Sequence, residues 1–462
     1  MPLSAAMIAR LVDIVGPGAV RQASDLAGLD AGVDPANFGA GLLVYPANTT
    51  ELARVLNGCE AARISIVPQG GRTGLAGGAV SRPGQLIVSL ERMRQIEAID
   101  PVSGTAIVQA GVTLAALAER AATHGLAPGI DFGARDSATI GGMISTNAGG
   151  CAAFRHGTMR ERVLGLEVVL ADGTVLTQLA EVRKRSAGLA LEQLFIGAEG
   201  TLGVISRAAL ALVPMDGLAA TALVSLDCVG DGIQLCTALR SSASLTPVAF
   251  ELMSANHAMT ACRALGLSGF DALLASPYLL LIAATAATFT AAESALWAQL
   301  EMAAESGLIQ NAVPAQNEAQ RQAMWRIRED WAVDRERPGG LWYDVSVPVA
   351  RVGAYLESFR QRLNRHDANL TLYIVGHLAD GNLHLTVNAP HPIRARYEEI
   401  AQLVTDGLLD IGGAFAAEHG IGLEKQATLQ RLVDPAKLAL MRRLKSLFDP
   451  HHILNPGKVL PD

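Results

Sequence analysis

The chain has 462 residues, too many for one hydrophobic core, and its length predicts two or three domains. Half of the residues are apolar and 18% are charged, a composition that excludes an intrinsically disordered protein. The formal net charge of −7 gives no reason to expect nucleic acid as a partner.

The N-terminal stretch MPLSAAMIARLVDIVGPGAV predicts an amphipathic helix rather than a secretory signal, because Arg10 and Asp13 interrupt its apolar residues. The longest apolar stretch, YLLLIAATAA from Tyr278, is too short to span a bilayer and predicts a buried strand. Five scattered cysteines without a CxxC pair favour a reducing compartment and no disulfide framework. We therefore expect a cytoplasmic protein, with peripheral attachment at the inner membrane as the alternative.

Strand and helix patterns alternate along the first half of the chain. Residues 41–46 predict a strand, a helix opens at Asn48, and residues 64–68 predict the next strand, which together form a βαβ unit. A second strand and helix follow in 104–125, and 164–176 predict a hairpin around Asp172 and Gly173. The pattern changes after ISRAALALVP, which places the end of the first domain near Pro214.

The βαβ unit ends in a glycine-rich loop, VPQGGRTGLAGGAV, at residues 67–80. The loop matches neither the dinucleotide fingerprint G-x-G-x-x-G nor the Walker A pattern. Neighbouring glycines let backbone N–H groups converge on a phosphate without obstruction by a Cβ atom. For this loop alone, a tight surface turn is an equally good interpretation.

Two more glycine-dense segments, SATIGGMISTNAGG (137–150) and GAEGTLGVIS (197–206), lie in the same predicted domain. With these three segments, the chain resembles the flavoproteins of the vanillyl-alcohol oxidase type, in order and in approximate spacing. The resemblance implies that the loop at 67–80 holds the FAD pyrophosphate. It assigns FAD contacts to Pro68, Gly70, Gly71, Arg72, Thr73, Gly74, Ser137, Ile140, Gly141, Gly142, Asn147, Ala148, Gly149, Gly150, Gly157, Glu199, Gly200, Gly203, Ile205 and Asn455. Some relatives attach FAD through a histidine in or near this loop, but none stands in 67–80, so we expect non-covalent FAD.

The second half contains the segment GHLADGNLHLTV at 376–387. Asp380 and Gly381 predict a two-residue hairpin turn, which would make His377 and His384 a directly opposed pair with Cβ atoms about 4.5–5.5 Å apart. Glu418 in AEHGIG offers a third ligand, and two histidines with one carboxylate suit Zn²⁺ or a similar transition metal. A histidine pair with a purely structural role is the alternative.

His419 follows Glu418 directly, so in an extended backbone the two side chains would point to opposite sides. One can bind a metal while the other faces a substrate hydroxyl; a histidine that satisfies a core hydrogen bond is the alternative. These segments resemble the D-2-hydroxyacid dehydrogenase branch of the flavoprotein group, which includes the D-lactate and D-2-hydroxyglutarate enzymes. The segment ILNPGKV also matches and implies that Asn455 and Lys458 lie near the flavin.

The resemblance implies an α+β fold: a two-part FAD-binding domain of the p-cresol methylhydroxylase (PCMH) type, an α+β substrate domain and a C-terminal helical segment that returns to the flavin. We place these parts at residues 38–217, 218–425 and 426–462. The expected reaction is flavin-dependent oxidation of a D-2-hydroxyacid to the 2-oxoacid.

In this reaction a hydride passes to the flavin N5 while a base takes the hydroxyl proton, and a metal lowers the pKa of the hydroxyl. His419 is the expected base, with Tyr343 the next candidate. Arg328 in MWRIRED stands where the family carries an arginine for the substrate carboxylate, with Arg326 as the alternative.

At two positions the residue differs from the one that relatives tend to carry, and these positions bear on the size and polarity of the substrate. Relatives that oxidise dicarboxylates tend to carry a lysine where Trp342 stands and an asparagine where Thr386 stands. Both departures reduce polarity, so D-lactate, D-2-hydroxyglutarate and a larger apolar analogue all remain candidate substrates. The expected substrate contacts are Arg328, Trp342, Tyr343, Thr386 and His419.

The partner that reoxidises the flavin is left open between electron-transfer flavoprotein, a quinone and a cytochrome, and a homodimer is expected. The principal alternative function is a non-catalytic flavin-binding subunit that transfers electrons within a larger dehydrogenase complex. A more distant alternative is lyase or ether-lipid chemistry on the same fold.

Overall fold

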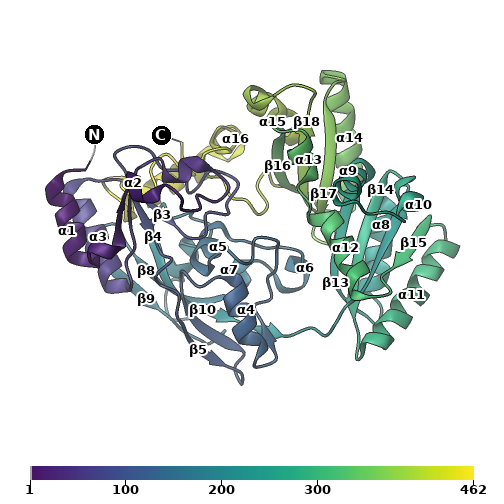
Figure 1. Cartoon of the computed structure of the whole chain (residues 1–462), viewed down its shortest axis with the longest axis horizontal. Helices are drawn as coiled ribbons and strands as arrows, with labels where there is room; N and C mark the ends of the chain where they lie inside the picture. Colours follow the sequence, from purple (N-terminus) through teal and green to yellow (C-terminus); the bar gives the residue numbers. More distant parts are fainter. Residues whose placement is uncertain (1–2, 462) are drawn as a thin grey trace. The chain divides into compact units, whose positions relative to one another are not determined.

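The computed structural model describes residues 3–461, which form two compact units (Figure 1). The first, here called the terminal unit, comprises Met1–Gly150, His156–Met215 and Glu418–Asp462. The second, the central unit, comprises Cys151–Arg155 and Asp216–Ala417. Both units mix helices with sheets, as expected for the predicted α+β fold.

The terminal unit contains two main sheets. The first has the order β1 (Val20–Gln22), β2 (Leu42–Val44), β4 (Leu86–Ser89), β3 (Ile66–Gln69). The second has the order β5 (Ile96–Asp100), β6 (Thr105–Gln109), β10 (Val204–Ala211), β8 (Val163–Val169), β9 (Val175–Gln178). A short pair joins β7 (Leu126–Ala127) to β11 (Val213–Pro214). Its longer helices are α1 (Ala5–Val15), α3 (Thr49–Ala62), α4 (Leu114–Ala122), α5 (Ile140–Thr146), α16 (Gln426–Leu432) and α17 (Pro435–Phe448).

Local sequence signals account for much of this unit. The predicted βαβ unit is confirmed as β2, α3 and β3, and the Asn48 side chain caps α3 by accepting from the Glu51 amide at 2.9 Å. The predicted N-terminal amphipathic helix is α1, which buries Leu11 and Ile14 against the first sheet. The predicted hairpin is β8 and β9, closed by a hydrogen bond from the Gly173 amide to the Leu170 carbonyl at 3.0 Å.

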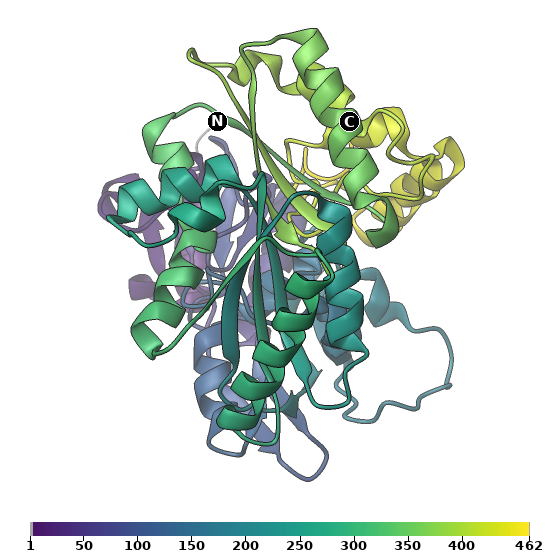
Figure 2. The ribbon, with the colours of Figure 1, turned by 90° about the vertical axis from the view of Figure 1, so that its right-hand side faces the viewer.

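The central unit is built on one antiparallel sheet in the order β15 (Asn311–Pro314), β12 (Ala220–Leu226), β14 (Tyr278–Thr285), β13 (Thr246–Ser254), β17 (Thr371–His377), β18 (Asn382–Asn388), β16 (Leu341–Ser346). Helices cover both faces (Figure 1, Figure 2). One face packs against α8 (Val229–Arg240), α11 (Phe289–Glu305), α14 (Val352–His366) and α15 (Tyr397–Thr405). The other packs against α9 (Ala255–Leu265), α10 (Asp271–Leu274) and α12 (Glu318–Glu329), which α13 (Ala332–Glu336) follows. The predicted strand at Tyr278 is confirmed as β14, and all of its residues are buried.

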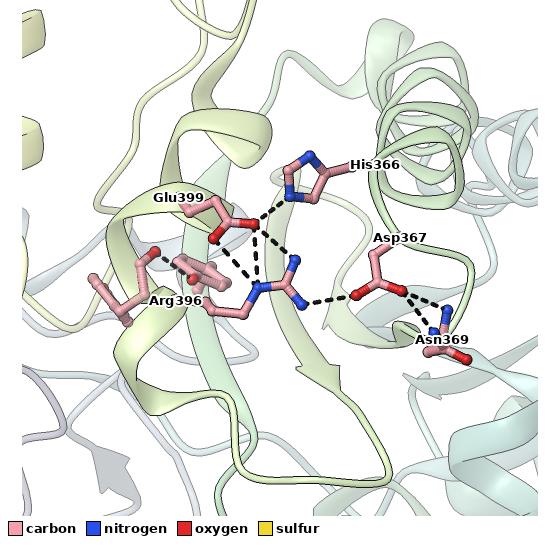
Figure 3. A network of polar contacts seen from close by, with 7 residues as sticks. His366, Asp367, Asn369, Arg396 and Glu399 are labelled. Atoms are coloured by element: carbon pink, nitrogen blue, oxygen red, sulfur yellow. Dashed lines mark hydrogen bonds and ion pairs between the residues drawn. The ribbon is translucent and has the colours of Figure 1, made fainter.

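A cluster of charged side chains connects the end of α14 to the start of α15 (Figure 3). Arg396 donates to Asp367 at 2.8 Å and to Glu399 at 2.7 Å, and His366 also bonds Glu399. Hydrogen bonds from Arg396 and the Asn369 amide lower the pKa of Asp367 to about 2. These charged groups satisfy one another, and as exposed ion pairs they add little to stability.

Two features are absent from the part of the chain that the structure describes. None of the helices within residues 3–461 has the length and apolar character needed to cross a membrane. All five cysteines are free thiols, as the spacing of the cysteines predicts.

Candidate active site

In the terminal unit, the loop after β3 packs against the second glycine-rich segment. A Cβ atom on Gly71 would lie 1.7 Å from the Ser137 carbonyl oxygen, and one on Gly70 would lie 2.1 Å from Thr139 Oγ1. Only glycine permits this close approach of the two backbones. The structure therefore brings together two of the three segments that the sequence assigns to FAD.

The third segment and the C-terminal motif meet the same loop. A Cβ atom on Gly200 would lie 2.8 Å from Pro68 Cγ, at a φ of +72°. Asn455 donates through Nδ2 to the Glu199 carbonyl at 2.8 Å and to the Gly78 carbonyl at 3.1 Å. Segments separated by more than half of the chain thus converge on residues 67–80.

The buried Glu199 side chain fixes the segment that follows Glu418 in the same unit. Its carboxylate accepts from the Ile421 amide at 2.7 Å and from the Gly422 amide at 3.0 Å. Burial raises the pKa of Glu199 to about 6, although these hydrogen bonds and two lysines act in the opposite direction. Burial also lowers the pKa of Lys458, whose ammonium donates to Asn455 Oδ1 at 3.1 Å, to about 8.

Some residues assigned to FAD make contacts that explain their identity without a cofactor. The guanidinium of Arg72 forms an ion pair with Glu91 at 2.5 Å and lies over the Phe38 ring. A Cβ atom on Gly141 would lie 2.6 Å from that of Ala110, and Ile205 is buried in β10. Asn147, Ala148, Gly149, Gly150, Gly157 and Gly203 also lie in this unit, whereas the backbone at Gly74 faces open space.

In the central unit, strands β16, β17 and β18 have one polar and one apolar face. The apolar face contributes to the core beneath α14 and α15. The other, here called the polar face, carries Trp342, Asp344, Ser346, Tyr373, Val375, His377, Asn382, His384, Thr386 and Asn388. Alternation with a period of two places all these side chains on one side of the sheet.

The hairpin that presents the two histidines differs from the predicted one. His377 is opposite Asn382 and His384 is opposite Val375, so residues 378–381 form the turn and the predicted direct pairing of the histidines is wrong. The longer turn lets the amides of Asp380 and Gly381 both bond the His377 carbonyl, at 3.3 and 3.0 Å. Because the shift in register is even, both histidines stay on one face, with ring centroids 5.4 Å apart.

Glu251 on β13 connects His377 to Arg328. Its carboxylate, almost fully buried, accepts from His377 Nδ1 at 2.8 Å and from Arg328 Nε at 2.7 Å. Burial acts to raise the pKa of Glu251, but the charges of His377 and Arg328 outweigh it, so the pKa is below its usual range. With Nδ1 donating to Glu251, the Nε2 atom of His377 is the one suited to bind a metal.

Asp344 on β16 organises the opposite edge of the polar face. Its Oδ1 accepts from Asn382 Nδ2 at 2.9 Å and lies 3.6 Å from His384 Nδ1. Its Oδ2 accepts from the Ala417 amide at 2.9 Å. Asp344 therefore holds the end of the central unit, one residue before Glu418.

Glu418 and His419 begin the C-terminal part of the terminal unit. The Oε1 atom of Glu418 accepts from the Gly150 amide at 2.6 Å, which joins Glu418 to the end of the second glycine-rich segment. The His419 side chain is half-buried. Both residues directly follow Ala417, whose amide donates to Asp344 in the central unit.

The remaining predicted substrate residues divide between the two faces. Trp342 lies opposite Thr386 on the polar face. Tyr343 points to the other side, where its hydroxyl donates to the Tyr397 carbonyl at 2.8 Å and its ring stacks on the Tyr397 ring. The prediction that Tyr343 contacts substrate is therefore incompatible with its place in the core, because neighbouring residues of a strand point in opposite directions.

Comparison with known protein families decides the family of the chain. The family description "FAD linked oxidases, C-terminal domain" matches residues 218–459, and "FAD binding domain" matches residues 40–178. The chain belongs to the FAD-linked oxidase family. Apart from residues 151–155, its FAD-binding match falls on the terminal unit, where the three glycine-rich segments converge.

The curated relatives of this FAD-linked oxidase confirm its resemblance to the D-2-hydroxyacid dehydrogenase branch. The mitochondrial D-2-hydroxyglutarate dehydrogenase of Bos taurus is 35% identical over 91% of this chain and 77% of its own length. The D-2-hydroxyglutarate dehydrogenase of Stutzerimonas stutzeri is 33% identical over 90% of each chain.

Solved structures confirm the predicted fold of this FAD-linked oxidase. The structure of p-cresol methylhydroxylase with substrate bound superposes with a TM-score of 0.74 over 99% of this chain and 96% of that one, at 18% identity. Alkyldihydroxyacetonephosphate synthase gives a TM-score of 0.71 over 98% and 86% of the two chains, at 16% identity. The PCMH-type α+β architecture is thus shared at low sequence identity.

Proposed function

We propose that this protein oxidises a D-2-hydroxyacid to the 2-oxoacid, with FAD as the hydride acceptor. The observation that carries the proposal is the arrangement of His377 on the polar face with Glu251 and Arg328, in a member of the FAD-linked oxidase family. Relatives named D-2-hydroxyglutarate dehydrogenase support the substrate class. A non-catalytic subunit would have no need for this buried arrangement of charge.

The terminal unit has the features of an FAD site. The backbone at Gly74 faces open space, whereas Gly70 and Gly71 are packed, so the loop combines a rigid base with an accessible N–H segment. FAD bound there would supply the N5 atom that accepts the hydride. We propose non-covalent binding by the residues assigned to FAD in residues 67–80, 137–157 and 197–205 and by Asn455, within a domain spanning 38–217.

The polar face suits a divalent metal, because one candidate ligand, His377, already donates a hydrogen bond to a carboxylate behind it, that of Glu251. We propose that His377, His384 and Glu418 hold a metal of the Zn²⁺ type, within a substrate domain at 218–425 followed by a C-terminal segment at 426–462. Glu251 would orient His377, since metal-binding histidines commonly donate their second ring nitrogen to a carboxylate. A bound metal would lower the pKa of the substrate hydroxyl.

The chain's own residues then divide two tasks. His419 takes the hydroxyl proton, and Arg328 binds the substrate carboxylate through its Nη groups while Nε remains on Glu251. Glu251 is a positioning residue in this proposal, because one buried carboxylate orients both a metal ligand and the substrate-binding arginine. Trp342 and Thr386 border the substrate on the polar face.

We propose that the reduced flavin passes its electrons to electron-transfer flavoprotein or a quinone. We also propose that the protein is a homodimer in the cytoplasm. The test is turnover of D- and L-2-hydroxyacids of several sizes with dichlorophenolindophenol as artificial acceptor. We expect activity with D-acids and its loss in His384→Ala. Purified protein that reduces the dye with none of the acids, despite carrying its flavin, would refute the proposal.

A further inference from the structure

The polar face changes character along its strands. His377, His384 and Asp344 mark one end, and Trp342, Thr386 and Tyr373 lie across the three strands at the next position of the same face. Successive side chains on one face of a strand are about 7 Å apart. A ligand held by its head group at the histidines would therefore extend its tail toward Trp342.

A second tryptophan joins this region from the segment that carries Arg328. Trp331, between α12 and α13, contacts Trp342 edge to face with ring centroids 5.5 Å apart. The two residues are 50% and 37% exposed, so part of this apolar pair is accessible to a ligand. The segment from Arg328 to Trp331 thus carries an arginine that bonds Glu251 and an aromatic ring that contacts Trp342.

A carboxylate beside the tryptophans disfavours an anionic tail at this position. Asp334 accepts from Trp342 Nε1 at 2.6 Å, which places a carboxylate beside the aromatic pair. Two arginines of the surrounding segments are paired with acids: Arg335 with Asp330 at 2.6 Å, and Arg263 with Glu336. A second substrate carboxylate would meet the charge of Asp334 and lose its own hydration.

We propose that Trp331 and Trp342 form a subsite for an apolar side chain, aromatic or branched aliphatic, on the C2 atom of the D-2-hydroxyacid. The proposal rests on the proposed function and narrows its substrate class from hydroxyacids in general to monocarboxylates with a bulky apolar tail. The tail would pack on the tryptophan rings while Asp334 keeps Trp342 in place.

The experiment measures anaerobic flavin reduction of the holoenzyme by D-lactate, D-phenyllactate and D-2-hydroxyglutarate. We expect kcat/KM for D-phenyllactate to exceed that for D-2-hydroxyglutarate at least about tenfold, since contacts with an apolar pocket discriminate by roughly 10–200-fold per group. Trp342→Lys should reverse the ratio of these two acids, and Asp334→Asn should lower KM for D-2-hydroxyglutarate. Both changes should affect D-lactate less than the two longer acids, because D-lactate has no tail to reach the subsite.

Trp297→Lys is the matched control, because Trp297 is 40% exposed on α11 at the opposite side of the sheet. It should leave the ratio of the two acids unchanged.

A preference for D-2-hydroxyglutarate that Arg337→Met abolishes would overturn the proposal, because Arg337 lines a cleft beside Tyr373 that could take a carboxylate. An unchanged ratio in Trp342→Lys would also overturn it. Failure of the proposed function would look different, as none of the three acids would reduce the flavin.

Discussion

The two units present chemistry in different ways. In the terminal unit the candidate site is made of backbone, brought close by glycines such as Gly71 and Gly200. In the central unit it is made of side chains, sorted onto one face of a sheet by the alternation of strands β16 to β18. A glycine-based site depends on the absence of atoms, whereas a side-chain site depends on which group stands at each position.

The largest effect should come from adding one methyl group to the backbone site. Gly71→Ala would place Cβ 1.7 Å from a carbonyl oxygen, so we expect loss of FAD and a lower Tm, measured by the flavin-to-protein ratio and thermal unfolding. Gly18→Ala is the control, because Gly18 lies in the same unit outside the segments assigned to FAD and no atom lies within 4 Å of its Cβ position. Equal flavin content in both variants would contradict a backbone site at this loop.

Substitutions in the side-chain site should remove the metal and leave FAD bound, whereas Gly71→Ala should remove FAD. His377→Ala or His384→Ala should lose the metal and at least about a thousandfold of turnover, because several kcal/mol of charge stabilisation would disappear, yet both should keep FAD. His366→Ala is the matched histidine control, since His366 belongs to the charged cluster at α14. Elemental analysis and flavin absorbance give both readouts; active enzyme without stoichiometric metal would disprove the metal proposal.

His419 sharpens the comparison because it lies where the chain returns to the terminal unit. His419→Ala should keep metal and flavin but reduce kcat by roughly 10²–10⁴, the range for a positioned base. The defect should shrink as pH rises and hydroxide substitutes for the imidazole. Loss of metal instead would show that Glu418 and His419 have exchanged roles.

Glu251 should affect two properties at once. Glu251→Gln should weaken metal binding by about 10–100-fold, as loss of an outer-shell partner does, and should raise KM by releasing Arg328. Arg328→Lys should raise KM alone, because a point charge keeps attraction but loses the bidentate geometry. Metal titration and steady-state kinetics separate the two; a metal affinity unchanged in Glu251→Gln would remove its positioning role.

The smallest effect is on stability and follows from His257, beneath α12. Burial, followed by the charge of Arg328, lowers the pKa of His257 to about 4, and its Nε2 bonds the Ile327 carbonyl at 3.2 Å. Since the folded state resists protonation, the stabilisation is complete above pH 6.5 and is lost as pH falls toward 4, by about 3 kcal/mol. Urea unfolding of wild type and His257→Gln at several pH values should show this loss only in wild type.

Sequence signals predicted the terminal unit well because they are local. The cap at Asn48 and the βαβ unit follow from neighbouring residues, and the three glycine-rich segments can each be recognised alone. Their convergence with Asn455 depends on contacts between distant parts of the chain. Only the family resemblance predicted that these segments share one cofactor.

In the central unit, the alternation of polar and apolar residues could be predicted from the sequence, but the pairing register of the strands could not. An even shift preserved the shared face of His377 and His384 although their direct pairing was wrong. Alternation from Trp342 and Asp344 could have placed Tyr343 in the core. Glu251 was missed because its partners are far away in sequence, and the one signal was a lone acid in the apolar strand TPVAFELMS.

The central claim is that the protein removes hydride from a D-2-hydroxyacid whose head group the polar face binds. Single-turnover flavin reduction without oxygen, with the D and L enantiomers of one acid compared in wild type and His384→Ala, tests it most directly. We expect the D enantiomer to bleach the flavin at least about a hundredfold faster than the L enantiomer, and this bleaching to be lost in the variant. Equal rates for the two enantiomers, or full bleaching in His384→Ala, would contradict it.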